Sequence, residues 1–314
     1  MNPKAKGYLL GAVAAAAYGM NPLFALPLYA DGMNPDSVLF FRYLFAIPVL
    51  GLMLKARGRG LRVGKGEPGL LALFGIVFAL SSLTLFQSYG HMDAGIASTL
   101  LFVYPILVAV IMAVFFRERL SAVTVLCILT AVSGIGLLYR GTDGATLSPT
   151  GTLLVMGSAL SYAVYIVGIN QTRLKDVPTL RVTFYVLLSG LSVFVVRLLF
   201  GGEGLTLPGK WYLWGNLVAL GLFPTAVSLL CTTSAIQYIG STRTAILGAL
   251  EPVTALFFGM TVFGERLTPR DLAGVVLVLG AVGCVVAGGP VGHALVRLRK
   301  MFPRLNRGQK NDQQ

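Results

Sequence analysis

The sequence has few charged residues for its length. Asp, Glu, Lys and Arg make up 12% of 314 residues, against about a quarter in a typical soluble domain. Hydrophobic residues make up 55%, and the mean hydropathy is +0.78. This composition argues against a water-soluble domain, and we expect a protein that lies mostly within a lipid bilayer.

The residues of common metal and catalytic sites are also scarce. Cys127, Cys231 and Cys284 fall in apolar runs without paired spacing, so neither a disulfide framework nor a zinc site is indicated. No H-E-x-x-H motif, nucleophile elbow or His-carboxylate cluster is present, which argues against an embedded enzyme. The lack of a Walker motif leaves ATP-driven transport unsupported. We expect no cofactor and no metal.

Long apolar runs separated by short polar turns dominate what is present. A membrane-spanning helix needs about 20 apolar residues, and continuous apolar runs fit helices better than the alternating strands of a membrane barrel. The first run lacks a signal-peptide cleavage pattern and is kept as a span. The sequence predicts an all-α membrane protein of ten transmembrane helices: Tyr8–Tyr29, Ser37–Leu54, Leu70–Gly90, Gly95–Phe116, Ala122–Leu138, Gly151–Asn170, Thr179–Phe200, Trp211–Gln237, Ser241–Phe263 and Leu272–Gly288.

The second half of the chain repeats the first at an offset of 147 positions. Pro105, Phe116, Glu118, Arg119, Leu120 and Gly136 reappear as Pro252, Phe263, Glu265, Arg266, Leu267 and Gly283. Residues 1–140 and 148–289 therefore form two five-helix repeats, and 290–314 form a basic, partly disordered tail. Five spans per repeat is an odd number, so the repeats are inverted. Inverted repeats are typical of secondary transporters that work by alternating access around a central site.

The net charge of +13 raises the possibility of nucleic-acid binding, but its distribution favours a membrane. With the N-terminus placed in the cytoplasm, most Lys and Arg fall on the cytoplasmic side, and few remain outside. This is the positive-inside pattern, and it predicts that both termini are cytoplasmic. We expect the basic tail to contact anionic lipid and not DNA.

Short motifs in both repeats give the chain a family resemblance. They are Pro105, Phe116-Arg117-Glu118-Arg119-Leu120 and Gly134 in the first repeat, and Glu251-Pro252, Phe263-Gly264-Glu265-Arg266-Leu267, Asp271 and Gly274 in the second. The chain resembles the drug/metabolite transporter superfamily with tandem EamA domains, most of all the YddG-type exporters of aromatic and apolar amino acids. The resemblance implies a transporter of small molecules in the bacterial inner membrane.

The E-R-L turns of the two repeats also have a structural interpretation. In the second turn, Thr268 can cap the last helix, Pro269 suits its first position, and Asp271 favours its positive end. We therefore expect capped hairpins in which the glutamates pair with arginines or cap backbone amides, in preference to a gating or substrate role. The turn residues are Glu118, Arg119, Glu265 and Arg266.

Glu251 is the acid placed most deeply in a predicted span, where a charge costs about 2.5 to 3.5 kcal/mol on insertion scales. Its repeat counterpart is Tyr104, and each residue precedes a proline that removes a helix hydrogen bond. Two interpretations stay open: a binding site for a substrate ammonium or a proton, and a buried structural acid tied to a neighbouring helix.

The first helix of each repeat carries aromatic residues at helical spacing. Tyr18 and Asn21 lie three apart in one, and Tyr162 and Tyr165 lie at equivalent positions in the other. This symmetry predicts that both helices face a shared cavity. The rings suit an apolar side chain or an ammonium, and Asn21 can bind a carboxylate. The alternative is simple packing between helices.

The third span carries a polar stripe of Thr84, Gln87, Ser88 and His91. Such a stripe avoids lipid, so we expect it to line the interior, with His91 either a titrating gate or a solvated or capping residue. Arg42 is a deep cation in the second span. Because it lies close to the outer interface, we expect its side chain to extend toward water, although a substrate carboxylate is an alternative partner.

These features together favour an exporter of zwitterionic metabolites, with aromatic or apolar amino acids as cargo and a proton as a candidate coupling ion. Efflux of cationic aromatic drugs is the alternative. The scarcity of basic residues in the spans disfavours phosphorylated cargo, and the internal repeat favours transport over a lipid scramblase or an enzyme. The oligomeric state stays open, a monomer included.

Overall fold

The computed structural model describes residues 2–284 except 59, 62, 65, 118–121, 140–147, 202–203, 240–243 and 245–246. All regular secondary structure in these residues is helical, which confirms the predicted all-α class for this part of the chain. A helix at 269–284 follows the elements α1 (Pro3–Gly19), α2 (Asn21–Ala30), α3 (Pro35–Ala56), α4 (Glu67–Ser88), α5 (Ala94–Leu101), α6 (Tyr104–Phe116), α7 (Ala122–Tyr139), α8 (Pro149–Gln171), η1 (Arg173–Asp176), α9 (Thr179–Phe200), α10 (Leu213–Gly221), η2 (Leu222–Val227), α11 (Ser228–Ile239) and α13 (Leu250–Val262).

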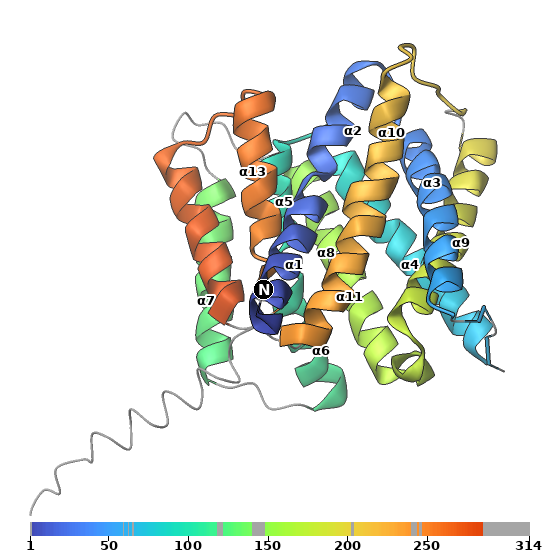
Figure 1. Cartoon of the computed structure of the whole chain (residues 1–314). Helices are drawn as coiled ribbons and strands as arrows, with labels where there is room; N and C mark the ends of the chain where they lie inside the picture. The colour runs from blue at the N-terminus through green and yellow to red at the C-terminus, as the bar shows by residue number, and fades with distance from the viewer. Residues whose placement is uncertain are drawn as a thin grey trace, which may run out of the picture.

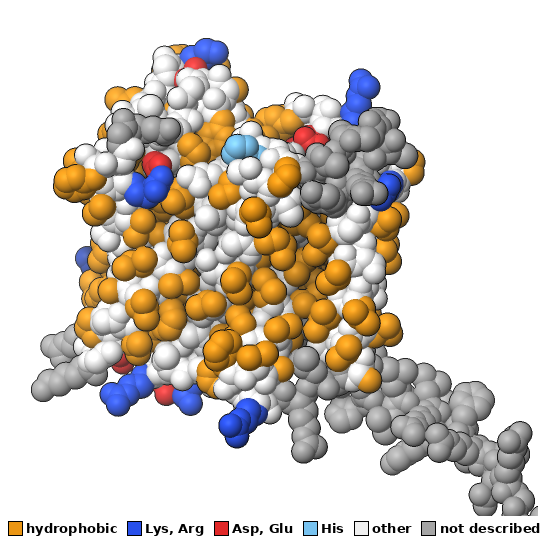
Figure 2. Space-filling model, turned by 180° about the vertical axis from the view of Figure 1, so that it is seen from behind, with side chains coloured by type: hydrophobic (Ala, Val, Ile, Leu, Met, Phe, Trp, Pro, Cys, Tyr) orange, Lys and Arg blue, Asp and Glu red, His pale blue; other side chains and the backbone are white. Residues whose placement is uncertain are grey.

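Seven helical segments in the described part of the chain are long and apolar enough to cross a membrane. Two further apolar helices, Thr124–Leu138 and Leu250–Val262, are shorter. On the face seen in Figure 2, hydrophobic side chains cover the middle, and most Lys and Arg side chains lie near its two ends. The protein is therefore a multi-pass membrane protein, whereas the count of ten spans and the side on which the termini lie stay predictions.

Several of the predicted spans are interrupted or distorted near a proline. Pro22 follows the break between α1 and α2, Pro105 lies at the start of α6, and Pro224 lies in the π-helix η2 between α10 and α11. Proline has no backbone N–H and clashes with the carbonyl of the residue four positions earlier, so the helix cannot continue unchanged through it. The first two of these segments each consist of two shorter helices, and the third changes to a π-helix midway, while each is still long enough to be one span.

Helices from both halves of the sequence pack against one another around a common interior (Figure 1). α1 packs on α11 and α13, α4 packs on α8 and α9, and α6 packs on α8. α7 and the helix at 269–284 lie side by side at one edge. Their backbones touch, because a Cβ atom on Gly134 would lie 2.9 Å from the carbonyl oxygen of Gly274. Small residues allow such close packing where lipid provides no hydrophobic drive.

Candidate functional site

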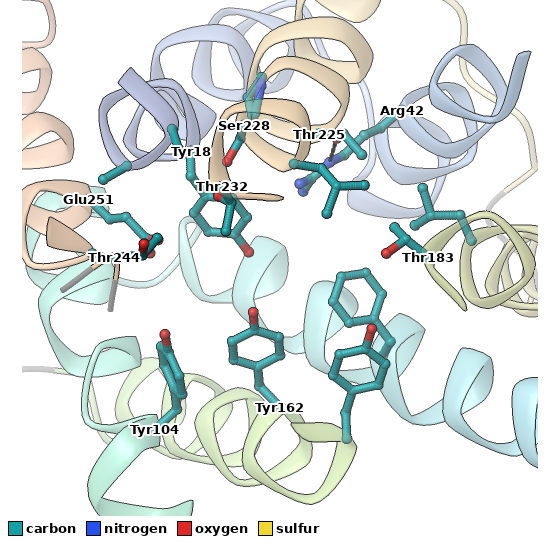
Figure 3. Close-up of a pocket in the computed structure, with 18 of the residues that line it drawn as sticks. Tyr18, Arg42, Tyr104, Tyr162, Thr183, Thr225, Ser228, Thr232, Thr244 and Glu251 are labelled. Carbon is teal, nitrogen blue, oxygen red and sulfur yellow. Dashed lines mark hydrogen bonds between the residues drawn. The ribbon is translucent and has the colours of Figure 1, made fainter. Parts of the chain in front are cut away.

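A cavity of about 390 Å³ lies in the interior of the bundle, between helices of both halves. Its walls come from α1, α3, α4, α6, α8, α9, η2, α11, α13 and the segment that leads into α13. The hydroxyl groups of Tyr18, Tyr104 and Tyr162 point into it from three different helices (Figure 3). Small-molecule sites measure about 300 to 1,000 Å³, so this cavity has room for one molecule of amino-acid size.

One side of the cavity is an aromatic wall made of Phe78, Tyr104, Tyr162 and Tyr165. The Tyr104 and Tyr162 rings meet edge to face with centroids 4.7 Å apart, Tyr162 and Tyr165 are stacked at 5.9 Å, and Phe78 lies 5.0 Å from Tyr165. The wall joins α4, α6 and α8, and Tyr18 of α1 lines the same cavity. Tyr18 of α1 and the two tyrosines of α8 therefore line the same cavity.

Glu251 lies on another side of the cavity, in the first turn of α13. Tyr104 occupies the equivalent first turn of α6, so the repeat-related pair faces one space from two helix N-termini. The partial positive charge of a helix N-terminus favours an anion there. Within the described residues, no Lys or Arg forms an ion pair with Glu251. A cationic group that enters the cavity would therefore meet the carboxyl group of Glu251 in its wall.

Arg42 lies in α3 and also lines the cavity. It is only 5% exposed, so the expectation that its side chain extends to the outer interface is wrong. Its Nε atom donates a hydrogen bond to Thr225 Oγ1 at 3.2 Å, and its guanidinium lies 5.2 Å from the centre of the Phe86 ring. Neighbours on η2 and α4 hold the side chain inside the protein, a restraint that sequence position alone does not reveal.

Several other polar residues line the cavity although the sequence interpretation did not select them. They are small hydroxyl-bearing side chains on helices that the sequence showed only as apolar spans: Thr183, Thr225, Ser228, Thr232 and Thr244. The sequence does contain a feature that could have identified two of them as cavity residues. Thr225 and Ser228 closely follow Pro224 and so lie where a helix is disturbed.

Three predicted site residues donate side-chain hydrogen bonds to backbone carbonyl oxygens of the preceding turn, and they do not line the cavity. Asn21 Nδ2 donates to the carbonyl oxygen of Tyr18, the carbonyl that Pro22 leaves without its helix partner. The Thr84 hydroxyl donates to Leu80 O at 3.0 Å, and the Ser88 hydroxyl donates to Leu85 O at 2.6 Å. The polar stripe exists, but short side chains on a helix commonly bond to the preceding turn.

Gln87 and His91 line a separate hollow together with Asp36 and Arg197. The latter two form an ion pair, with Arg197 Nε 2.6 Å from Asp36 Oδ1. His91 is exposed, so the solvated alternative describes its position. The structure thus separates the ten candidate binding residues: it brings Tyr18, Tyr104, Tyr162, Tyr165 and Glu251 together at the cavity and leaves Asn21, Thr84, Gln87, Ser88 and His91 outside its lining.

The second E-R-L turn caps a helix of the other half of the chain. Glu265 Oε1 accepts a hydrogen bond from Ala94 N at 2.9 Å, and Oε2 accepts one from Gly95 N at 3.3 Å, at the start of α5. Arg266 is exposed. The first turn, with Glu118 and Arg119, lies outside the described residues, as do the tail and its predicted contacts with lipid.

The predicted cap of the last helix is present as well. Thr268 N and Thr268 Oγ1 both donate to Asp271 Oδ2, at 2.9 and 2.7 Å, and Asp271 N donates to Thr268 Oγ1 at 3.2 Å. These reciprocal bonds satisfy backbone donors that a helix start leaves free. The capping interpretation of the second turn is therefore confirmed for Thr268 and Asp271.

Glu265 is expected to make stability depend on pH. Burial, and to a smaller extent the nearby Asp93 charge, raise the pKa of the Glu265 carboxyl, against the opposing effect of its two amide partners. The folded protein then holds this proton more tightly than the unfolded chain does. The free energy of unfolding should accordingly fall as pH rises from about 4.5 through the raised pKa.

Thermal unfolding in detergent across this pH range would measure the effect. Glu265→Gln should show a smaller loss of stability with rising pH than the wild type, whereas Asp176→Asn, at an exposed acid of η1, should follow the wild type. Identical pH profiles for Glu265→Gln and the wild type would contradict the expectation.

Comparison with known proteins places the fold in a family. The family model described as the EamA-like transporter family matches residues 5–140 and 149–287. An uncharacterized transporter of Archaeoglobus fulgidus is 32% identical over 252 residues, which cover 80% of this chain and 86% of the relative. The threonine/homoserine exporter RhtA of Escherichia coli K12 is 30% identical over 230 residues, which cover 71% of each chain.

A solved crystal structure agrees with the arrangement of the helices. It superposes with a TM-score of 0.64 at 18% sequence identity and covers 95% of this chain and 99% of its own, which at this identity speaks for the fold alone. The family match spans nearly all of both halves of the sequence and the helices that surround the cavity. The chain belongs to the EamA-like transporter family, within the drug/metabolite transporter superfamily.

Proposed function

We propose that this protein is a secondary transporter of the inner membrane that exports small metabolites, namely amino acids with aromatic or apolar side chains. The observation that carries this proposal is the interior cavity in which an aromatic wall faces Glu251. An ammonium group is attracted both by a carboxylate and by the faces of aromatic rings. RhtA of Escherichia coli is a threonine/homoserine exporter, which supports amino acids as the class of cargo.

The same two features also fit a cationic aromatic drug, which is the alternative cargo. The size of the cavity favours the smaller molecule, because about 390 Å³ lies near the lower limit of small-molecule sites. The buried cation Arg42 in the cavity wall further opposes cargo that carries only positive charge.

Alternating access is the mechanism that we propose for export. Helix breaks at Pro105 in the first half and Pro224 in the second border the cavity, and interrupted helices are common at the substrate sites of transporters with inverted repeats. In this proposal the two halves exchange conformations, so that the cavity opens to one side of the membrane at a time. A proton released or bound by Glu251 is a candidate coupling ion.

Transport by purified protein in liposomes tests the function. Vesicles loaded with L-phenylalanine, L-threonine or a cationic dye are compared with empty vesicles, with and without a pH gradient. We expect protein-dependent flux of the amino acids, faster with a pH gradient if a proton is coupled. Flux of the dye alone would favour the drug-efflux alternative, and no flux of any compound would contradict the proposal.

The aromatic wall should determine side-chain preference. Tyr162→Ala removes a ring that contacts both Tyr104 and Tyr165. We expect transport of L-phenylalanine to fall by about 10-fold and that of L-threonine to fall less, because an aromatic pair adds about 0.5–1.5 kcal/mol beyond its buried area. Initial rates in liposomes measure the ratio. An equal loss for both amino acids would mean that the tyrosine only holds helices together.

A further inference from the structure

Arg42 is a buried cation in the wall of the cavity. It is 5% exposed and lies in a helix that crosses the apolar part of the protein. In the described residues, its side chain hydrogen-bonds to the hydroxyl groups of Thr225 and Tyr18. Hydroxyl groups solvate a guanidinium but do not neutralise it. The ion pair found in the described part of the chain joins Arg197 to Asp36 and leaves Arg42 out.

The surroundings of Arg42 fix the direction of its guanidinium. Thr225 accepts from Nε, and the Thr225 hydroxyl in turn donates to Leu220 O at 3.3 Å across the π-helix. Gly221 allows η2 to approach α3, because a Cβ atom there would lie 3.1 Å from the carbonyl oxygen of Arg42. A π-helix in this place is consistent with a functional site, where such segments are frequent. The side chain is thus held in place before any ligand binds.

Arg42 and Glu251 present opposite charges to the same cavity. Figure 3 shows them on opposite sides, with Tyr18 between them, and they form no ion pair with each other in the described residues. Two separated charges of opposite sign around a space of about 390 Å³ match a small zwitterion. A cargo with only one charge would leave either Arg42 or Glu251 without an opposite charge in an apolar interior, which is costly.

We propose that Arg42 binds the carboxylate of the cargo and makes a free carboxylate a requirement for transport. This inference rests on the proposed function and specifies its substrate class. A guanidinium presents two parallel N–H donors that match a carboxylate, which a single ammonium does not. The site therefore selects α-amino acids over their amides and over amines of the same shape.

The test compares L-phenylalanine with L-phenylalaninamide, and L-threonine with L-threoninamide, in liposomes that hold the wild-type protein. Each amide keeps the side chain and the ammonium and loses only the carboxylate. We expect each amino acid to be transported at least about 10-fold faster than its amide, the scale of a lost hydrogen bond to a charged group. Transport of neither acid nor amide would overturn the proposed function and this inference together, whereas equal rates for acid and amide would overturn the inference alone.

Variants then assign the preference to Arg42. Arg42→Gln should bring the acid-to-amide ratio close to one, and Arg42→Lys, which keeps a cation at the same depth, should give an intermediate ratio. Arg57→Gln, at the exposed end of the same helix, should keep the wild-type ratio. An unchanged acid-to-amide ratio in folded Arg42→Gln would overturn the proposal. If Arg42→Gln does not fold, an unchanged ratio in Arg42→Lys would do the same. An equal loss of the acid-to-amide preference in Arg57→Gln would also overturn it.

Discussion

Replacing Glu251 by Gln should reduce amino-acid transport by at least about 10-fold and remove its dependence on pH, since a hydrogen bond to a charged group contributes about 1.5–3 kcal/mol. Gln has nearly the same shape and keeps hydrogen-bonding capacity, but it neither attracts an ammonium nor exchanges a proton. Glu251 faces the cavity at the start of α13 and has no ion-pair partner in the described residues. Its charge is therefore available to the cargo or to a proton.

Transport rates in liposomes from acidic to alkaline pH, with thermal stability as the control for folding, measure this effect. Tyr104→Phe is the matched comparison, because it alters the repeat-related residue on the same cavity without changing its charge. That variant should keep the shape of the wild-type pH profile. A folded Glu251→Gln protein with wild-type rates and a wild-type profile would show that the acid is structural.

Gly19→Val should unfold or strongly destabilise the protein, with a loss of about 3 kcal/mol, the upper part of the usual range for overpacking. α1 ends at Gly19, against α13. A Cβ atom there would collide with the carbonyl oxygen of Glu251 and lie 2.7 Å from Thr254 Cβ. Because one obstacle is backbone, a rotamer change cannot relieve the clash, and the two helices must separate.

Thermal unfolding in detergent and the yield of folded protein report this loss. Gly157→Val is a suitable control, because no heavy atom outside its own helix surroundings lies within 4 Å of a Cβ atom at that position of α8. Any Gly19→Val protein that folds should transport poorly, since the separation also shifts Tyr18 and Glu251 apart. Wild-type stability of Gly19→Val would show that α1 and α13 are not packed as described.

The membrane-helical class and the main cavity residues follow from the sequence for simple reasons. Continuous apolar runs can satisfy their backbone in lipid only as helices. The spacing of Tyr162 and Tyr165 places both rings on one face of α8, and the Glu-Pro pair marks an acid at a disturbed helix end. Each of these signals depends on residues near one another in the chain, so no knowledge of the tertiary fold is required.

The role of Arg42 depends on neighbours that are distant in the sequence. Its position along α3 suggests access to water, but η2 and α4, with Thr225 and Phe86, close over it. A sequence pattern gives the depth of a residue and not the helix that covers it. Glu265 shows the same limit, because a capping role is predictable from the turn while its partner α5 lies in the other half of the chain.

The polar stripe of α4 illustrates a different limit. Thr84 and Ser88 lie on a helix as the spacing requires, yet their hydroxyl groups bond to the preceding turn. A short hydroxyl side chain can satisfy itself this way in any environment, so its presence in a span does not indicate a cavity. Aromatic rings and the carboxyl group of Glu251 are not accounted for by such local bonds, so they indicated the cavity better than the hydroxyl side chains did.

Protection of a cavity cysteine by cargo tests the central claim most directly, namely that the interior cavity is the transport site. Thr232 lines the cavity, so Thr232→Cys, in a protein whose Cys231 and Cys284 are replaced by Ala, provides a reporter for a small thiol reagent. Thr150→Cys, in the separate hollow, is the control. We predict that L-phenylalanine slows labelling of Thr232→Cys alone and that Glu251→Gln abolishes the protection. Unchanged labelling of Thr232→Cys at amino-acid concentrations that saturate transport would contradict the account.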